Sequence, residues 1–152
     1  RIKNKYPLTV LFITHQMEVA RSLFDRIAVM SAGRIVEVAS AYELFARPKS
    51  QSAKELVARS NEYELPDEIA EREKELFFIT YKEDRAYEAV IAEVARIFDV
   101  NLSIIAGKID YIQKKPLGTL LVSLQCKDEQ KRAKVLEYIG ERAYIAAFKK
   151  RV

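Results

Sequence analysis

The second half of the chain constrains the fold most, because two strand-like segments there flank a short turn sequence. Residues 102–113 are rich in isoleucine, and residues 119–126 alternate between side chains that suit opposite faces of a sheet. The segment between them, Lys-Lys-Pro-Leu-Gly at 114–118, has the composition of a turn. The pattern predicts an antiparallel hairpin, so this half must build its core around a sheet.

The segments that flank the hairpin complete a larger unit. Residues 76–81 predict a strand, and residues 86–98 place their apolar side chains on one face of a helix. After the hairpin, Asp128 can cap a second helix, and residues 143–149 predict a last strand. This βαββαβ order is that of the ferredoxin-like fold, a four-stranded antiparallel sheet with two helices on one face.

The alternation in residues 119–126 assigns the two faces of the predicted sheet. The side chains expected toward the helices are Leu120, Val122 and Leu124, and those expected on the open side are Thr119, Leu121 and Ser123. Leu121 is apolar among polar neighbours. We therefore expect the open side to be covered, and a second copy of the chain is one candidate cover.

The first half has a different pattern. Residues 8–13 form a nearly continuous apolar run, which is typical of a central parallel strand buried on both faces. A helical spacing over 17–24, two short strands around Gly33, and a capping box of Ser40 and Glu43 follow. The strand at 8–13 needs parallel neighbours that these residues do not supply. We therefore expect this half to be rearranged, swapped between copies, or ordered only by a larger protein.

Composition divides the chain into three parts. Residues 61–74 are acidic, contain Pro66 and have few core-forming side chains, so they predict a linker. The linker separates an N-terminal unit, residues 1–60, from a C-terminal unit, residues 75–152. The predicted class is α+β: a ferredoxin-like antiparallel sheet preceded by an incomplete α/β unit.

The bulk composition favours a folded protein of the cytoplasm. Hydrophobic residues make up 49% and charged residues 32%, which is typical of globular domains. No apolar run approaches the roughly 20 residues that cross a bilayer. Cys126, the one cysteine, cannot form an internal disulfide, which suits a reducing compartment. The chain begins at Arg1 rather than methionine, so we expect a fragment or a processed product.

Residues 11–18 and 25–37 resemble the closing elements of an ABC-transporter ATPase. The first resembles the strand that ends in the switch histidine, here His15, and the second resembles the strand pair that follows it. Residues 42–45 with Pro48 resemble the closing helix. The resemblance implies that His15 contacts the γ-phosphate of ATP, held with magnesium, in a complete ATPase.

The rest of that nucleotide site is missing from the sequence. The motif G-x-x-x-x-G-K-[ST], the aspartate–glutamate pair that serves magnesium and catalysis, and the signature Ser-Gly-Gly-Gln do not occur in these 152 residues. We therefore expect His15 to be inert in this chain. The chain alone is expected to be no enzyme and to hold no cofactor or metal.

The second unit resembles a NIL domain, the regulatory module that follows the ATPase in bacterial methionine importers. The resemblance is carried by residues 98–112 and 115–122. It implies a homodimer through the NIL domain, L-methionine as regulatory ligand, and a membrane permease as partner of the parent subunit. It also implies a peripheral position on the inner face of the cell membrane.

The resemblance places the ligand site at the start of the second strand of this unit. The candidate ligand-binding residues are Asn101, Leu102, Ser103, Ile104, Ile105 and Gly107. Where the family carries Asn-Ile-Leu, this chain has Ser103-Ile104-Ile105, which removes an amide that both donates and accepts. Asn101, two residues earlier, can point the same way.

Three functions stay open at this point. The first is a regulatory amino-acid-binding module, and the second is a ligand-free dimerisation domain of the same transporter subunit. The third is RNA recognition, which needs aromatic side chains on the open face of the central strands. Residues 119–126 contain no aromatic side chain, so we expect no nucleic-acid partner.

Overall fold

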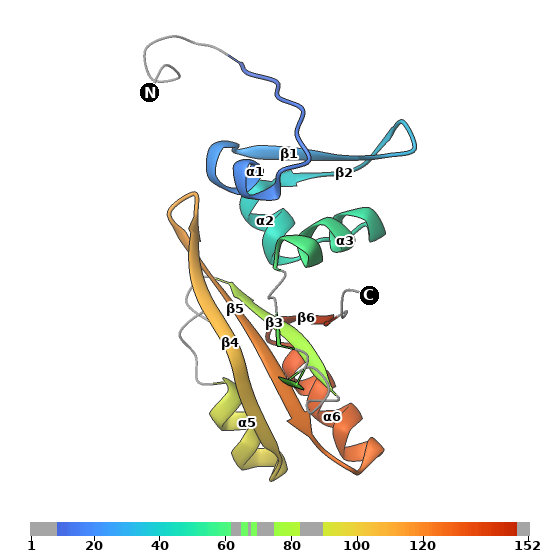
Figure 1. The fold of residues 1–152 in the computed structure, drawn as a ribbon, viewed down its shortest axis with the longest axis vertical. Helices are drawn as coiled ribbons and strands as arrows, with labels where there is room; N and C mark the ends of the chain where they lie inside the picture. The colour runs from blue at the N-terminus through green and yellow to red at the C-terminus, as the bar shows by residue number, and fades with distance from the viewer. Residues whose placement is uncertain (1–8, 62–64, 67, 70–74, 83–89, 149–152) are drawn as a thin grey trace.

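A computed structural model describes residues 9–61, 65–66, 68–69, 75–82 and 90–148. It contains a two-stranded sheet of order β1-β2 and a four-stranded sheet of order β4-β5-β3-β6. Figure 1 shows the small sheet with α1, α2 and α3 at one end of the molecule, and the large sheet with α5 and α6 at the other.

The apolar segment near the N-terminus is not a strand. Residues 9–13 have no sheet partner, and Val10, Leu11, Phe12 and Ile13 are each more than half exposed. The strand prediction for 8–13 is therefore wrong over residues 9–13, and residue 8 lies outside the described residues. The physical reason is the lack of parallel neighbours that would pair with the backbone N–H and C=O groups.

The rest of the first unit is ordered, with elements close to the predicted positions. They are α1 (Met17–Leu23), β1 (Arg26–Ser31), β2 (Arg34–Ser40), α2 (Ala41–Ala46) and α3 (Gln51–Ser60). The hydroxyl of Ser40 accepts a hydrogen bond from the Glu43 N–H at 3.1 Å, as the capping box predicts. We expected this half to be rearranged, swapped between copies, or ordered only by a larger protein. The elements from α1 to α3 are not rearranged.

The β1–β2 hairpin turns on Ala32 and Gly33, whose φ angles are +48° and +76°. Positive φ at both positions is the geometry of a type I′ turn, which matches the twist of antiparallel strands. The sequence predicted this conformation for Gly33. Ala32 adopts it without the freedom of glycine.

Glu37, in β2, holds the start of α3. Its carboxylate accepts hydrogen bonds from the backbone N–H of Ser50 at 2.7 Å and of Lys49 at 3.1 Å. Partial burial opposes the charged form, but the hydrogen bonds from Ser50 and Lys49 outweigh it. The pKa of Glu37 therefore lies below its ordinary value of 4.5.

This geometry predicts an acid-sensitive first unit. A lowered pKa in the folded state gives stability that is present above pH 4.5 and is lost as the pH falls through the folded-state pKa. Glu37→Gln should remove that part of the pH dependence, because an amide does not titrate there. Thermal unfolding from neutral pH to below pH 4.5 checks this. Identical pH profiles for the two proteins would contradict it.

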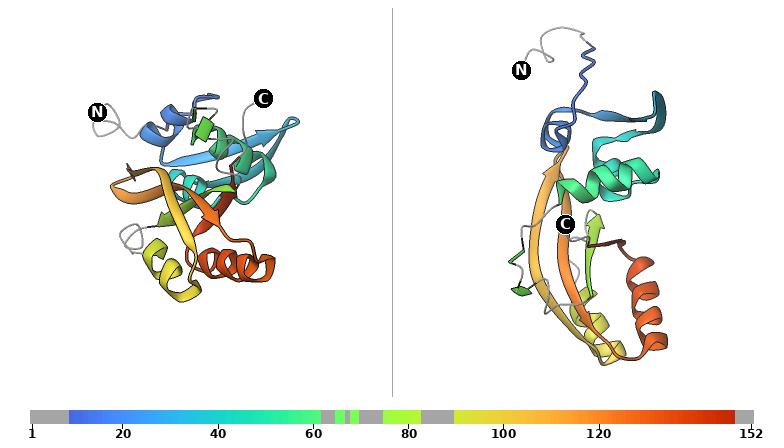
Figure 2. Two further views of the ribbon diagram at one scale, coloured as in Figure 1. Left: turned by 60° about the horizontal axis from the view of Figure 1, so that its bottom comes forward. Right: turned by 45° about the vertical axis from the view of Figure 1, so that its right-hand side comes forward.

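The second unit has the predicted strand and helix order. Its described elements are β3 (Leu76–Lys82), α5 (Val90–Phe98), β4 (Asn101–Ile112), β5 (Lys115–Gln125), α6 (Glu129–Gly140) and β6 (Tyr144–Ala147). Every neighbouring pair of strands is antiparallel, and both helices lie on one face (Figure 2). Asp128 caps α6 by accepting hydrogen bonds from the N–H groups of Gln130 and Lys131. The ferredoxin-like prediction is confirmed, except that residues 86–89 and 149 lie outside the described residues.

The turn between β4 and β5 differs from the prediction. It consists of Gln113 and Lys114 alone, with φ angles of +53° and +66°, and not of residues 114–118. Pro116 and Gly118 lie within β5. The described pairing of β5 with β3 ends at Leu117, and Pro116 pairs only with Tyr111 of β4. The missing N–H of Pro116 therefore removes no hydrogen bond between β5 and β3.

The two faces of the large sheet follow the predicted alternation. On the helix side, Val122 and Leu124 are buried in the core and Leu120 packs against it. On the other side, Leu121 is fully buried within a single chain, as are Thr119 and Ser123. Phe78 lies opposite Leu121 on this side, and the ring of Phe148 packs 5.9 Å from that of Phe78. Leu121 is therefore buried without a second copy.

Candidate ligand-binding strand and its junction with the first unit

The six candidate ligand-binding residues all lie on the first half of β4. In the described sheet, β4 is an edge strand and pairs only with β5. Asn101, Ile104 and Gly107 are exposed, and Leu102, Ser103 and Ile105 are half-buried. A polar ligand could therefore reach the side chains of Asn101 and Ser103, while Ile104 lies opposite Val122, on the helix side of the sheet.

A β-bulge interrupts β4 within this set of residues. The register shifts between Ile104 and Ala106, so that Ile105 has no direct partner in β5. Before the bulge, Ser103 lies opposite Ser123, and after it Ala106 lies opposite Leu121. Bulges bend an edge strand and redirect its side chains, and they are common next to functional sites.

Gly107 has a packing role that the sequence did not reveal. A Cβ atom at this position would lie 2.5 Å from Cδ2 of Leu120, so the Leu120 side chain fills the space that glycine leaves open. The sequence resemblance placed Gly107 among the candidate ligand-binding residues. In this structure, the Leu120 side chain of β5 makes the close approach to Gly107.

His15 lies far from the other candidate residues. It is exposed and precedes α1, which sits by the hairpin end of β4 (Figure 1). Asn101 begins β4 at the opposite end, next to α5. The structure thus does not bring His15 and residues 101–107 into one site.

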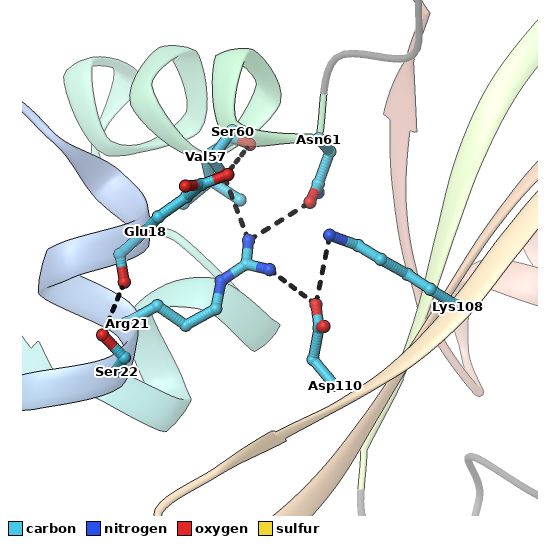
Figure 3. Close-up of polar contacts among 8 residues, drawn as sticks. All are labelled: Glu18, Arg21, Ser22, Val57, Ser60, Asn61, Lys108 and Asp110. Atoms are coloured by element: carbon cyan, nitrogen blue, oxygen red, sulfur yellow. Dashed lines mark hydrogen bonds and ion pairs between the residues drawn. The ribbon is translucent and has the colours of Figure 1, made fainter.

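Arg21 of α1 connects these two regions, although nothing in the sequence pattern marks it as a site residue. Its Nη1 atom lies 2.5 Å from Oδ2 of Asp110 in β4. Its Nη2 atom donates to the Ser60 hydroxyl at 3.2 Å and to Oδ1 of Asn61 at 3.4 Å (Figure 3). Lys108 also lies within 3.2 Å of the same Asp110 oxygen. One carboxylate of the NIL-like sheet thus faces two cations.

The surroundings of Arg21 strengthen this ion pair. The Arg21 side chain is 14% exposed and that of Asp110 is 29% exposed, so water screens the pair only in part. The guanidinium carbon also lies 4.5 Å from the centre of the Phe45 ring, a cation–π contact. Two charges 89 residues apart in sequence give no local signal of such a pair.

Further contacts join the two units around the β4–β5 hairpin. The Tyr42 hydroxyl donates to the Pro116 carbonyl at 3.0 Å, and the Gln113 amide donates to the Asp25 carbonyl at 2.8 Å. Lys82 and Glu43 form an exposed ion pair at 2.6 Å. Beneath these polar contacts, both units contribute to one apolar cluster, which consists of Ala41, Tyr42, Phe45, Ala46, Val57, Ile112 and Leu117. We call this cluster the junction core.

None of the described helices is long and apolar enough to cross a membrane.

Comparison with known proteins places these features in a family. The NIL domain model matches residues 75–145. Methionine import ATP-binding protein MetN 1 of Bacillus licheniformis is 32% identical over 140 residues, which are 91% of this chain and 42% of that protein. Methionine import ATP-binding protein MetN 2 of Salmonella typhimurium is 37% identical over 125 residues, which are 82% of this chain and 37% of that protein.

Among solved structures, the C-terminal domain of an ABC transporter/ATP-binding protein from Enterococcus faecalis gives a TM-score of 0.46 at 18% identity, covering 56% of this chain and 97% of that one. The chain spans well under half the length of the curated relatives above. Residues 75–145 therefore belong to the NIL domain family, and the chain as a whole is similar to a part of the ATP-binding proteins named for methionine import.

Proposed function

We propose that this chain is the amino-acid-sensing region of an importer subunit, and that its NIL domain binds L-methionine as a regulatory ligand. The observation that carries the proposal is the NIL match over residues 75–145, in a chain whose relatives are named for methionine import. The parent subunit would couple ATP hydrolysis to methionine import. It would work with a membrane permease on the inner face of the cell membrane.

The start of β4 is the proposed ligand site. Asn101 and Ser103 supply polar groups for the ammonium and carboxylate of an amino acid, because an amide and a hydroxyl each both donate and accept. The half-buried Ile105, at the bulge, supplies apolar surface for a thioether side chain, whereas Ile104 lies on the helix side of the sheet. The bulge at these residues sets their side chains apart from the regular alternation of the strand.

Regulation then requires only a difference in affinity between two states. If methionine binds better when the ATPase domains are apart, it shifts the transporter toward that resting state. Each factor of ten in that preference corresponds to about 1.4 kcal/mol. His15 would act only within the parent ATPase, where a phosphate-binding loop holds ATP and magnesium.

Dimerisation through the NIL domain is part of the proposal. The edge strand β4 exposes Ile104, Ile109 and Tyr111, and an exposed apolar edge favours pairing with another chain. The same observation supports the alternative function, a dimerisation domain without a ligand. The two functions differ in whether methionine stabilises the folded protein, because a ligand that binds only the folded state must raise its stability.

Calorimetric titration with L-methionine tests the proposal. We expect saturable binding, and we expect Ser103→Asn to tighten it about fivefold, since one added hydrogen bond is worth roughly 1 kcal/mol. Ser52→Asn, in α3, is the matched control and should leave affinity unchanged. The absence of heat with methionine at millimolar concentration would count against sensing. Equal unfolding temperatures with and without methionine would favour the ligand-free dimerisation domain.

A further inference from the structure

Strand β4 extends from the proposed ligand site to the junction between the two units. Its first half carries residues 101–107, and Asp110 follows three residues later. The partner of Asp110 is Arg21, in the helix that begins two residues after His15. The strand thus has the candidate ligand residues at one end and a contact with the switch-histidine helix near the other.

We infer that Arg21 is the joint by which the NIL sheet holds α1 in place, and that Asp110 is its anchor on β4. The guanidinium contacts three other elements of the chain. It binds Asp110 of β4 and Ser60 and Asn61 at the end of α3, and it lies over Phe45 of α2. Because Arg21 itself belongs to α1, the position of that helix depends on all of them.

The chemistry of arginine suits such a joint. Its planar head offers several N–H donors in fixed directions, so one side chain can bind a carboxylate on one side and neutral oxygens on the other. Figure 3 shows this arrangement, with Asp110 and Asn61 reached by different nitrogens. Lysine carries a single ammonium and would not hold the same set of partners in one geometry.

The charge balance makes Asp110 more than a passive partner. Arg21 and Lys108 approach the same Asp110 oxygen, so neutralising Asp110 leaves two positive charges close together at a partly buried site. Removing Arg21 leaves Asp110 paired with Lys108, and the Asp110 carboxylate then no longer ties β4 to α1 and α3. Loss of either partner should therefore loosen α1.

Hydrogen exchange of the complete 152-residue chain tests the joint. Arg21→Gln and Asp110→Asn should each speed exchange of the α1 amides about tenfold, because each removes a charge-assisted hydrogen bond. The double variant should be no faster than the faster single variant, since Arg21→Gln already removes the contact that Asp110 makes with α1. Unchanged α1 exchange in the single variants, or effects that multiply in the double variant, would overturn the joint.

Arg132→Gln is the matched control, because it also removes an arginine from an ion pair. Arg132 pairs with Glu75 at 2.8 Å within the second unit, away from α1. We expect this variant to leave α1 exchange at the wild-type rate. Faster α1 exchange in Arg132→Gln, equal to that of Arg21→Gln, would show that the effect is general destabilisation and would overturn the assignment.

The regulatory use of the joint rests on the proposed function, and its test separates the two. Methionine should change α1 exchange in the wild type but not in Arg21→Gln, although both proteins bind it. An equal response in both proteins would overturn transmission through Arg21. If methionine does not bind at all, the sensing proposal fails, while the variants without ligand still decide whether Arg21 holds α1.

Discussion

Phe45→Ala is expected to release the first unit from the NIL sheet while the sheet stays folded. Phe45 is 1% exposed and lies in the junction core, between Val57 of its own unit and Ile112 and Leu117 of the hairpin. Removal of a buried phenylalanine side chain costs about 3–5 kcal/mol. The change also removes the ring beneath the Arg21 guanidinium.

The first unit has little other core to hold it. Apart from the junction core, its described buried cluster consists of Val29, Leu44 and Ala53, with a few partly buried neighbours. The NIL sheet has a separate core against α5 and α6, which includes Ile79, Val94 and Ile139 and does not contain Phe45. The two cores should therefore respond differently to the same substitution.

Hydrogen exchange resolved along the chain measures this difference. We expect protection to fall in α1, α2 and α3 and to persist in β3, β4 and β5. Tyr42→Phe is the matched control: it keeps an aromatic ring in the junction core and removes the hydroxyl that donates to Pro116, a loss of about 1 kcal/mol. Simultaneous loss of protection in both units would show that they fold as one cooperative body and would contradict the prediction.

The fold of the second unit could be predicted because its signals are local. The alternation over residues 119–126, the helical spacing before residue 98 and the cap at Asp128 each depend on near neighbours in the sequence. The hairpin turn was placed wrongly because Gln113 and Lys114 adopt positive φ without being glycine or asparagine. Turn composition pointed instead to Pro116 and Gly118, which the sheet accommodates.

The candidate site shows the limit of the same reasoning. The sequence could place residues 101–107 on a strand, but the bulge after Ile104 depends on pairing with a strand about twenty residues away. The close approach of Leu120 to Gly107 depends on that register too. Arg21 and Asp110 resemble ordinary solvated charges in sequence, and only the docking of two units brings them together.

Residues 9–13 show how tertiary context overrides composition. Their apolar character is correct for a strand between two parallel neighbours, yet the described chain supplies none, and the segment lies exposed. A strand needs partners for its backbone as well as a suitable sequence. The same argument explains why β4, with a partner on one side only, remains the exposed edge where a ligand or a second copy is proposed to bind.

Tyr81→Phe is expected to make the second unit more resistant to alkaline unfolding. Tyr81, in β3, is 3% exposed and packs in the core between the sheet and its helices. Its buried hydroxyl has no hydrogen-bond partner in the part of the chain that the structure describes. Burial raises the pKa of Tyr81 from 10 to about 12, because the phenolate would lose its hydration.

The sign of the pH effect follows from the raised pKa. The folded protein keeps the Tyr81 proton more tightly than the unfolded chain, so the corresponding stability is complete below pH 10 and is lost as the pH rises toward 12. The loss is on the order of 2 kcal/mol. Phenylalanine has no proton to lose, and it also removes an unpaired buried hydroxyl, which should add about 1 kcal/mol at neutral pH.

Denaturant unfolding below pH 10 and near pH 12 should separate this residue from the other titrating groups. Tyr144→Phe is the matched control, since burial also raises the pKa of Tyr144, but that side chain is only half-buried and should contribute less. If the stability of Tyr81→Phe falls with rising pH as steeply as that of the wild type, another titrating group causes the alkaline sensitivity. A flatter profile in Tyr81→Phe than in Tyr144→Phe would assign it to the core of the NIL sheet, because of these two tyrosines only Tyr81 must carry its charge into that core.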